Sequence, residues 1–423
     1  MEDHPLRYKL ANELHARPFP TMSGPSTAVY IAIKQPSEAV SRNRTLDLEH
    51  LIALLDRHGA PHPQPGATHY SGKIGRHVLK WEQHTEFVTY TAFLDGLSDR
   101  PFDPVDFSVF PEDWLATAPG QRITSAMLRI CPREPVQQIE DQLDTWFVPE
   151  SLAVAQVLED AAVVAADFRI DPAGHLRFAI FANPDTGERR IGRVVQRLCE
   201  VETYKSMSML GFSRVRDLSP TIGDLDTRLT ELMIEMTGDT TPPEETLSQL
   251  LSISATLETM AARASFRFGA TGAYEAIVGQ RIASLREARF EGRQTFGEFM
   301  MRRYEPAMRT VKSTENRLKA LADRAIRAGD LLRTRVDVDR SAQNQKLLES
   351  MDQRADMQLR LQRTVEGLSV VAISYYAVSL AGYLIYPLTQ TTGLSKGMLT
   401  ALVTLPVVGL VWWMVRRIRQ KIE

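Results

Sequence analysis

The chain has 423 residues, of which 43% are hydrophobic and 24% charged, as in a folded protein of two or three domains. Its formal net charge of -2 gives no general electrostatic reason to expect nucleic acid as a partner. The two cysteines, Cys131 and Cys199, fit neither a disulfide framework nor a metal motif and favour a reducing compartment. The first ten residues contain no apolar run, so we expect no secretory signal there.

Residues 1–215 mix short β-branched segments with amphipathic ones. This pattern predicts a soluble α+β or α/β domain. Helices are predicted at 44–58 and 187–209. Strands are predicted at 26–34, 76–83, 86–94, 121–130, 153–158, 162–170 and 175–182, with a hairpin around His84 and Thr85.

Residues 216–364 are predicted to be a helical region. Helices are expected at 222–236, 243–268 and 274–290, with a break at Gly269–Gly272. Residues 295–363 are rich in good helix formers, and apolar residues at alternating three-four spacing predict a coiled-coil-like stalk helix. No linker separates this stalk from the apolar run that follows, so we expect one continuous helix.

The predicted transmembrane hairpin covers residues 365–415. Charge-free runs at 368–388 and 397–415 are each about 20 residues long, which matches the hydrocarbon core of a bilayer. The short loop between them holds a single Lys396, whereas the cytoplasmic tail 416–423 is basic. The basic residues expected to fix topology and to meet lipid headgroups are Arg416, Arg417, Arg419 and Lys421. This asymmetry predicts a multi-pass protein in a lipid bilayer, with both termini in the cytoplasm.

A polar arc runs along the first predicted span. At 100° per residue its members fall within about 80° of one another: they are Ser369, Tyr376, Ser379, Tyr383 and Gln390. A polar face in a membrane requires another helix or water beside it. Two interpretations stay open, namely hydrogen bonding between helices of a homo-oligomer and the lining of a pore.

The sequence offers no catalytic motif. It has no phosphate-binding glycine loop, dinucleotide fingerprint or nucleophile elbow, so we assign no enzyme activity, catalytic residue or cofactor. All but one of the nine histidines precede residue 85, but prolines surround His62 and no compact metal motif forms, so no metal site is assigned. His15 and Arg17 lie in a compact polar segment near the N-terminus, which suits either an anion or an ion-paired helix end.

Several segments resemble the signature of a bacterial family of uncharacterised, membrane-anchored proteins. They are Glu13–Pro18, Asn344–Asp352 and Gln362–Val370, and the resemblance extends over the whole chain. It implies location in the bacterial inner membrane and makes His15 and Arg17 signature residues of unknown role. The resemblance implies no particular activity.

The order of segments is also similar to that of the CorA class of divalent-cation channels, which are pentamers whose first span lines the pore. That class has Gly-Met-Asn at the outer end of this span, where the present chain has Leu384–Pro387. The resemblance implies a homo-oligomer with a divalent cation as partner, acting as an ion channel or a related assembly. The alternative is a non-transporting scaffold or sensor that presents its cytoplasmic domain to a partner.

Overall fold

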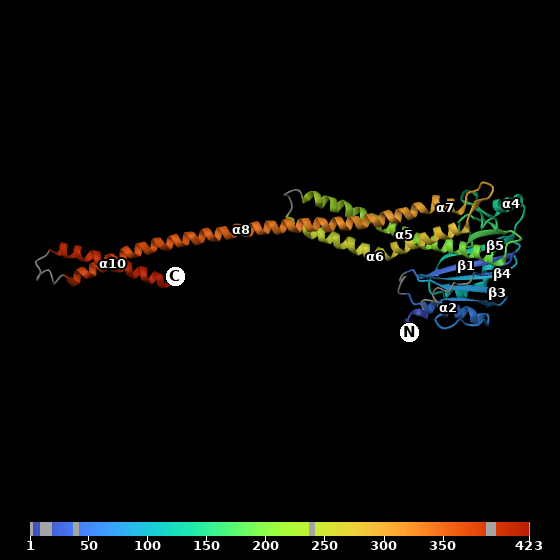
Figure 1. Ribbon diagram of the computed structural model, residues 1–423, viewed down its shortest axis with the longest axis horizontal. Coiled ribbons are helices and arrows are strands. Elements are labelled where there is room, and N and C mark those ends of the chain that lie inside the picture. Colours follow the sequence, from blue (N-terminus) through green and yellow to red (C-terminus); the bar gives the residue numbers. More distant parts are fainter. Residues whose placement is uncertain (1–2, 9–18, 37–41, 237–241, 386–394, 423) are drawn as a thin grey trace. The chain divides into compact units, whose positions relative to one another are not determined.

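The computed structural model describes residues 3–8, 19–36, 42–236, 242–385 and 395–422 (Figure 1). The chain divides into two compact units. The first comprises residues 1–240 and 248–328, and the second comprises residues 241–247 and 329–423. The first unit therefore holds a mixed β-sheet and a group of long helices, and the second holds the apolar C-terminal helices.

A nine-stranded sheet forms the centre of the first unit, in the order β2-β3-β4-β1-β5-β8-β7-β6-β9. All neighbouring strands are antiparallel except β5 and β8, which are parallel. The strands are β1 (Ser26–Lys34), β2 (His69–Ile74), β3 (His77–Gln83), β4 (Phe87–Asp95), β5 (Gln121–Pro132), β6 (Ala153–Val157), β7 (Ala162–Ala166), β8 (Leu176–Ala182) and β9 (Ala288–Arg289).

Helices cover both faces of this sheet. One face packs against α2 (Arg44–Arg57), α3 (Glu112–Ala116) and α4 (Val136–Trp146), with the short 3-10 helices η1 (Pro104–Val109) and η2 (Pro149–Ser151). The other face packs against the first turns of α5 (Glu188–Glu235), the end of α6 (Pro243–Leu285) and α7 (Phe296–Arg303). Strand β1 shows the result, because its alternate residues enter the two different cores and every position is buried.

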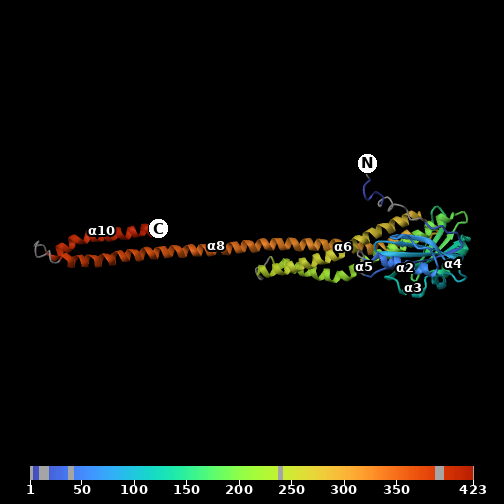
Figure 2. The same cartoon turned by 90° about the horizontal axis from the view of Figure 1, so that it is seen from below.

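Beyond the sheet, α5 and α6 run alongside the first part of α8 (Glu305–Ile385), as both views show (Figures 1 and 2). Gly211 of α5 lies against Thr271 of α6 so closely that a Cβ at Gly211 would be 2.9 Å from the threonine Cβ. Asp226 of α5 accepts from Arg317 at 2.8 Å and Arg324 at 3.2 Å, both on α8. Buried α8 residues such as Met308, Val311, Leu318 and Ala325 complete the packing.

Most of the predicted strands and helices of the first 215 residues are confirmed, with shifts of a few residues at their ends. The prediction missed β2, α3, α4 and β9, and β7 ends at Ala166 rather than residue 170. The predicted boundary at residue 215 falls inside α5.

The predicted break between the helices 222–236 and 243–268 is confirmed, whereas those at 210–221 and at Gly269–Gly272 were wrong. Helix α5 is one 48-residue helix that contains Pro220, and α6 is one 43-residue helix that continues through Gly269 and Gly272. Buried residues on both sides of Pro220, including Leu218 and Ile222, stabilise α5 across the proline through tertiary packing. The predicted stalk instead begins as two helices, since α7 ends at Arg303 before α8 starts.

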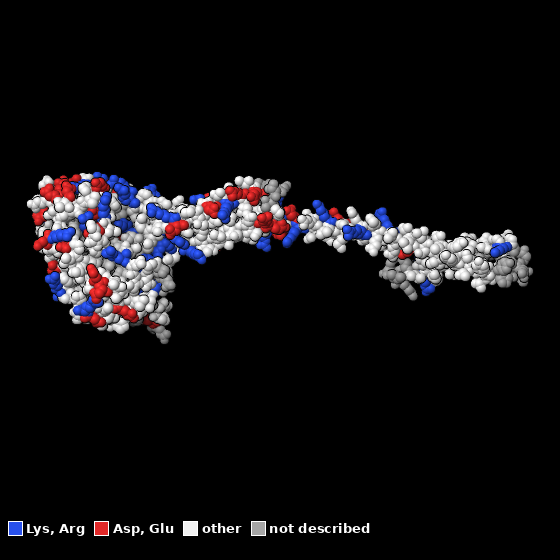
Figure 3. All heavy atoms as spheres, turned by 180° about the vertical axis from the view of Figure 1, so that it is seen from behind, with Lys and Arg blue, Asp and Glu red and all other residues white. Residues whose placement is uncertain are grey.

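The expectation that the stalk continues into the apolar run is confirmed, because α8 is a single helix of 81 residues. Helix α8 and α10 (Lys396–Ile422) are both long and apolar enough to cross a membrane. Figure 3 shows how few charged side chains this apolar region carries on the face in view, compared with the sheet and the rest of α8.

Candidate functional site

The turn between β3 and β4 is a densely bonded polar feature of the first unit. Strands β3 and β4 pair from Gln83 with Val88, and the His84 N–H donates to the Phe87 carbonyl at 2.9 Å to close the turn. Thr85 and Glu86 lie at its tip. Polar groups from α6 and from the segment that precedes α2 meet at this turn.

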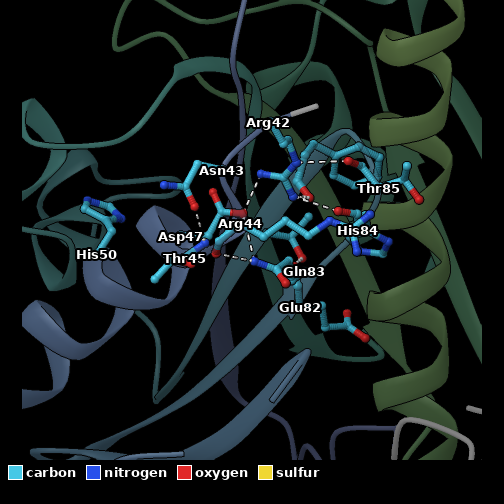
Figure 4. A network of polar contacts seen from close by, with 12 residues as sticks. Arg42, Asn43, Arg44, Thr45, Asp47, His50, Glu82, Gln83, His84 and Thr85 are labelled. Carbon is cyan, nitrogen blue, oxygen red and sulfur yellow. Dashed lines mark hydrogen bonds and ion pairs between the residues drawn. The ribbon is translucent and has the colours of Figure 1, made fainter. Parts of the chain in front are cut away.

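Arg42 holds the turn from one side (Figure 4). Its guanidinium is buried and donates to three backbone carbonyls, at 2.9 Å to Thr85, 2.6 Å to His84 and 3.1 Å to Phe87. It also forms a buried ion pair with Asp47 of α2, whose carboxylate accepts from the Gln83 amide at 2.9 Å. Burial raises the pKa of Asp47, although Arg42 opposes that rise. Because the Arg42 donors are used by the protein itself, this network is an anchor rather than a binding site.

Glu86 holds the turn from the other side. Its carboxylate is 1% exposed, forms an ion pair with Arg267 of α6 and accepts from the Tyr274 hydroxyl at 2.8 Å. Tyr204 of α5 stacks on Tyr274 with ring centroids 5.5 Å apart. Burial and the adjacent Glu86 carboxylate raise the pKa of Tyr274, so its hydroxyl stays a donor. The turn thus connects the sheet to α5 and α6.

A small cleft, which we call the α5 cleft, opens next to this turn between α5 and strands β3, β4 and β1. It has a volume of about 30 Å³, enough for one or two water molecules. Its polar lining includes Lys80, Glu82, His84, Thr89, Thr91, Gln196, Glu200 and Tyr204.

Hydrogen bonds and ion pairs connect the charged groups of the α5 cleft in series. Lys80 lies 3.2 Å from Glu82 and donates to Gln196 at 2.9 Å. Gln196 then donates to Glu200 at 2.8 Å, and Glu200 forms an ion pair with Arg281 of α6. Cys199 also lines the cleft, but burial raises the pKa of its thiol, which keeps it protonated and a poor nucleophile.

A buried serine–histidine pair also lies in the first unit. Ser125 and His175 lie 2.9 Å apart, but both are buried, and Asp171 accepts from the His175 backbone N–H rather than from its ring. Within the described ranges, no three His, Cys, Asp or Glu side chains gather in a way that could hold a metal ion. The histidines discussed from the sequence do not converge: His62 contacts Asp56, whereas His84 packs on Phe87.

In the second unit, two of the four described residues of the polar arc lie on an uncovered surface of α8. Tyr376 is 68% exposed and Tyr383 is 79% exposed, while Ser374 on another side of the helix is buried. The Ser379 hydroxyl donates back to the Tyr375 carbonyl at 2.9 Å. Ser369 is half-buried. Gln390, the last predicted member of the arc, lies outside the described residues.

A polar-edged opening lies between α8 and α10. It is lined by residues of both helices, namely Tyr375, Val378, Ser379, Gly382 and Tyr383 of α8 and Lys396 and Thr400 of α10. On α10, Arg416 lies over the Trp412 ring at 5.1 Å and Arg417 over the Trp413 ring at 5.0 Å. The side chains of Arg419 and Lys421, like His15 and Arg17, lie outside the described part of the chain.

A sequence family described as a protein of unknown function matches residues 2–422. The chain belongs to the DUF3422 family. The predicted membership of an uncharacterised family is therefore confirmed for nearly the whole length of this DUF3422 protein. No curated protein matches it.

Sequence reasoning missed the Glu86 junction of this DUF3422 protein. Arg267 lies 181 residues from Glu86 along the chain, and neither residue belongs to a local motif. A carboxylate directly before a buried strand was the only local signal available. It was not enough to identify a partner on a distant helix.

Proposed function

We propose that this DUF3422 protein forms a homo-oligomer in the bacterial inner membrane, with the polar arc of α8 facing the centre and both termini in the cytoplasm. In this proposal α8 and α10 form a transmembrane hairpin. Ions cross along the central axis, as the similarity in segment order to CorA-type divalent-cation channels implies.

The observation that carries the proposal is the exposure of Tyr376 and Tyr383 on the apolar last part of α8. In hydrocarbon a phenol hydroxyl without a partner is costly, because no water is available to bond it. Further copies of α8 would supply partners or enclose water next to these hydroxyls. The basic pair Arg416 and Arg417 supports a cytoplasmic C-terminus, since such residues favour that side of a membrane.

The exposed middle of α8 supports assembly as well. Between Asp337 and Val365 every side chain is exposed in the single chain, including Leu347, Leu348, Met351 and Leu361. Isolated helices of this kind gain their stability from packing an apolar face. A coiled-coil-like contact between copies would cover these leucines and methionines.

The first experiment is native mass spectrometry of the full-length protein in mild detergent. It is followed by a flux assay in proteoliposomes with Mg²⁺ and Mn²⁺. A ring-sized oligomer with cation flux supports the proposal. Replacing Tyr376 and Ser379 together should change that flux, whereas Val371→Ala on another side of α8 should not. A monomer would contradict the proposal, because one hairpin has no axis for ions to follow.

The second candidate function is a scaffold or sensor that does not transport. The exposed leucines and methionines of α8 favour it, because a partner helix could cover them as well as another copy could. A stable oligomer without flux of any tested ion would favour the scaffold over the channel. In that case the α5 cleft and the Glu86 turn would become the first places to search for a partner.

A further inference from the structure

A group of arginines gathers where α5 passes the C-terminal end of α6. Three come from successive turns of α5 and two from the end of α6 and the residues after it: Arg190, Arg193, Arg197, Arg281 and Arg286. We call them the α5–α6 arginine cluster. Its member Arg281 pairs with Glu200, the last residue of the series of polar contacts that starts at Glu82 in the α5 cleft.

The protein itself compensates this cluster only in part. Glu159 forms ion pairs with both Arg190, at 2.7 Å, and Arg286, and Glu200 pairs with Arg281. Within the described residues, neither Arg193 nor Arg197 has a carboxylate in ion-pair contact. Five guanidinium groups therefore face two carboxylates.

Arg197 is held within this positive environment. Its guanidinium donates to the Ser284 carbonyl at 2.8 Å, which fixes the side chain beside the end of α6. Burial lowers its pKa, and so do the positive charges of Arg193, Arg281 and Arg286, while the Glu200 carboxylate opposes the shift. Bringing like charges together in a partly desolvated place costs free energy unless an anion offsets them.

We propose that the α5–α6 arginine cluster is a binding site for a phosphate group. Guanidinium groups suit this ligand because their planar N–H forks match phosphate oxygens in bidentate pairs and stay charged at every physiological pH. Arg193 and Arg197 provide the forks that no carboxylate occupies, and Arg281 and Arg286 add positive charge around them. The phosphate comes from a soluble metabolite or from a lipid headgroup, since both present the same oxygens.

The test titrates the full-length, detergent-solubilised protein with sodium pyrophosphate by calorimetry. The parent protein should bind pyrophosphate. The double variant Arg193→Gln, Arg197→Gln should bind it at least roughly tenfold more weakly, because two bidentate pairs are lost. Arg193→Lys with Arg197→Lys keeps the charge without the fork and should fall between the two. Arg340→Gln, at an exposed position of α8, is the matched control and should bind like the parent.

A parallel arm identifies the source of the phosphate. Native mass spectrometry after addition of phosphatidylglycerol shows whether lipid adducts depend on the same arginines. Loss of those adducts in the double variant, without pyrophosphate binding by the parent, assigns the site to a headgroup.

Two results would overturn the proposal. One is that the parent protein binds neither pyrophosphate nor the lipid. The other is that the double variant binds as tightly as the parent. If the glutamine variant does not fold, the lysine variant decides, because affinity equal to that of the parent would remove any role for the forks. The melting temperature gives an independent readout, since a ligand bound only by the folded state raises it.

Discussion

At the scale of single residues, the loss of the buried Glu86 carboxylate should destabilise the first unit. Glu86→Gln leaves the half-buried Arg267 without its counter-charge and weakens the bond from Tyr274. Removing one member of a buried ion pair costs about 3–5 kcal/mol. We expect the melting temperature of the full-length protein in detergent to fall by roughly 5–10 °C.

The control for Glu86 is an exposed ion pair of the same domain. Arg57 and Asp113 lie 2.7 Å apart on the surface, so Asp113→Asn should shift the melting temperature little. Equal shifts for Glu86→Gln and Asp113→Asn would show that the turn is not an anchor between the sheet and α6.

Acid should destabilise the first unit through its buried histidines. Burial lowers the pKa of His50, which contacts the Tyr90 hydroxyl at 2.9 Å and the Trp114 carbonyl at 3.0 Å. The unfolded chain then binds the proton more readily than the folded one. The stability that neutral His50 contributes is therefore fully present above the ordinary histidine pKa of about 6.5. It is lost as the pH falls below that value.

We therefore expect the melting temperature to fall between about pH 7.5 and about pH 5.5, and less steeply in His50→Gln. The comparison uses the slope against pH, because the substitution also lowers stability at neutral pH by removing two contacts. His69→Gln on the exposed side of β2 is the control and should keep the slope of the parent protein. An unchanged slope in His50→Gln would assign the acid sensitivity to other groups, of which His175 is the next, since burial lowers its pKa too.

At the scale of the helix, two adjacent leucines of α8 provide a matched pair. Leu332 is 1% exposed and Leu331 is 67% exposed. Leu332→Ala should cost about 2–5 kcal/mol because it leaves a cavity, and Leu331→Ala about 0.5 kcal/mol or less. Hydrogen exchange of the α8 amides around them should become faster only in Leu332→Ala. Faster exchange in both variants would mean that this stretch of α8 owes its stability to helix propensity rather than to packing.

The strands and helices also show what local sequence can predict. Strand β1 was predicted with its observed ends because both of its faces are buried, which makes a continuous apolar run. Helix α6 was predicted as two helices because Gly269 and Gly272 are poor helix formers. A glycine costs only about 1 kcal/mol in a helix, less than the packing of Val278, Phe268 and Leu257 contributes on either side. The Glu86 junction could not be predicted, because pairing over such a separation depends on how the chain folds and not on spacing.

At the scale of the whole molecule, the proposed assembly makes a claim about which face of α8 meets another copy. Tyr376 and Val371 are both exposed, at 68% and 69%, and lie about 140° apart around the helix axis. If the polar arc faces the centre of an oligomer, a cysteine at Tyr376 lies close to the same cysteine in a neighbouring copy. The native cysteines Cys131 and Cys199 are buried and should contribute little background.

We expect Tyr376→Cys, treated in membranes with a short bismaleimide, to give covalent oligomers on a denaturing gel, and Val371→Cys to give few. Dilution of the labelled protein with unlabelled parent protein should reduce the cross-linked bands in proportion, because the link joins two copies. Efficient cross-linking at Val371 with none at Tyr376 would place the opposite face between copies. The tyrosines would then have to find hydroxyl partners in lipid headgroups, and an axial ion path along α8 would lose its support.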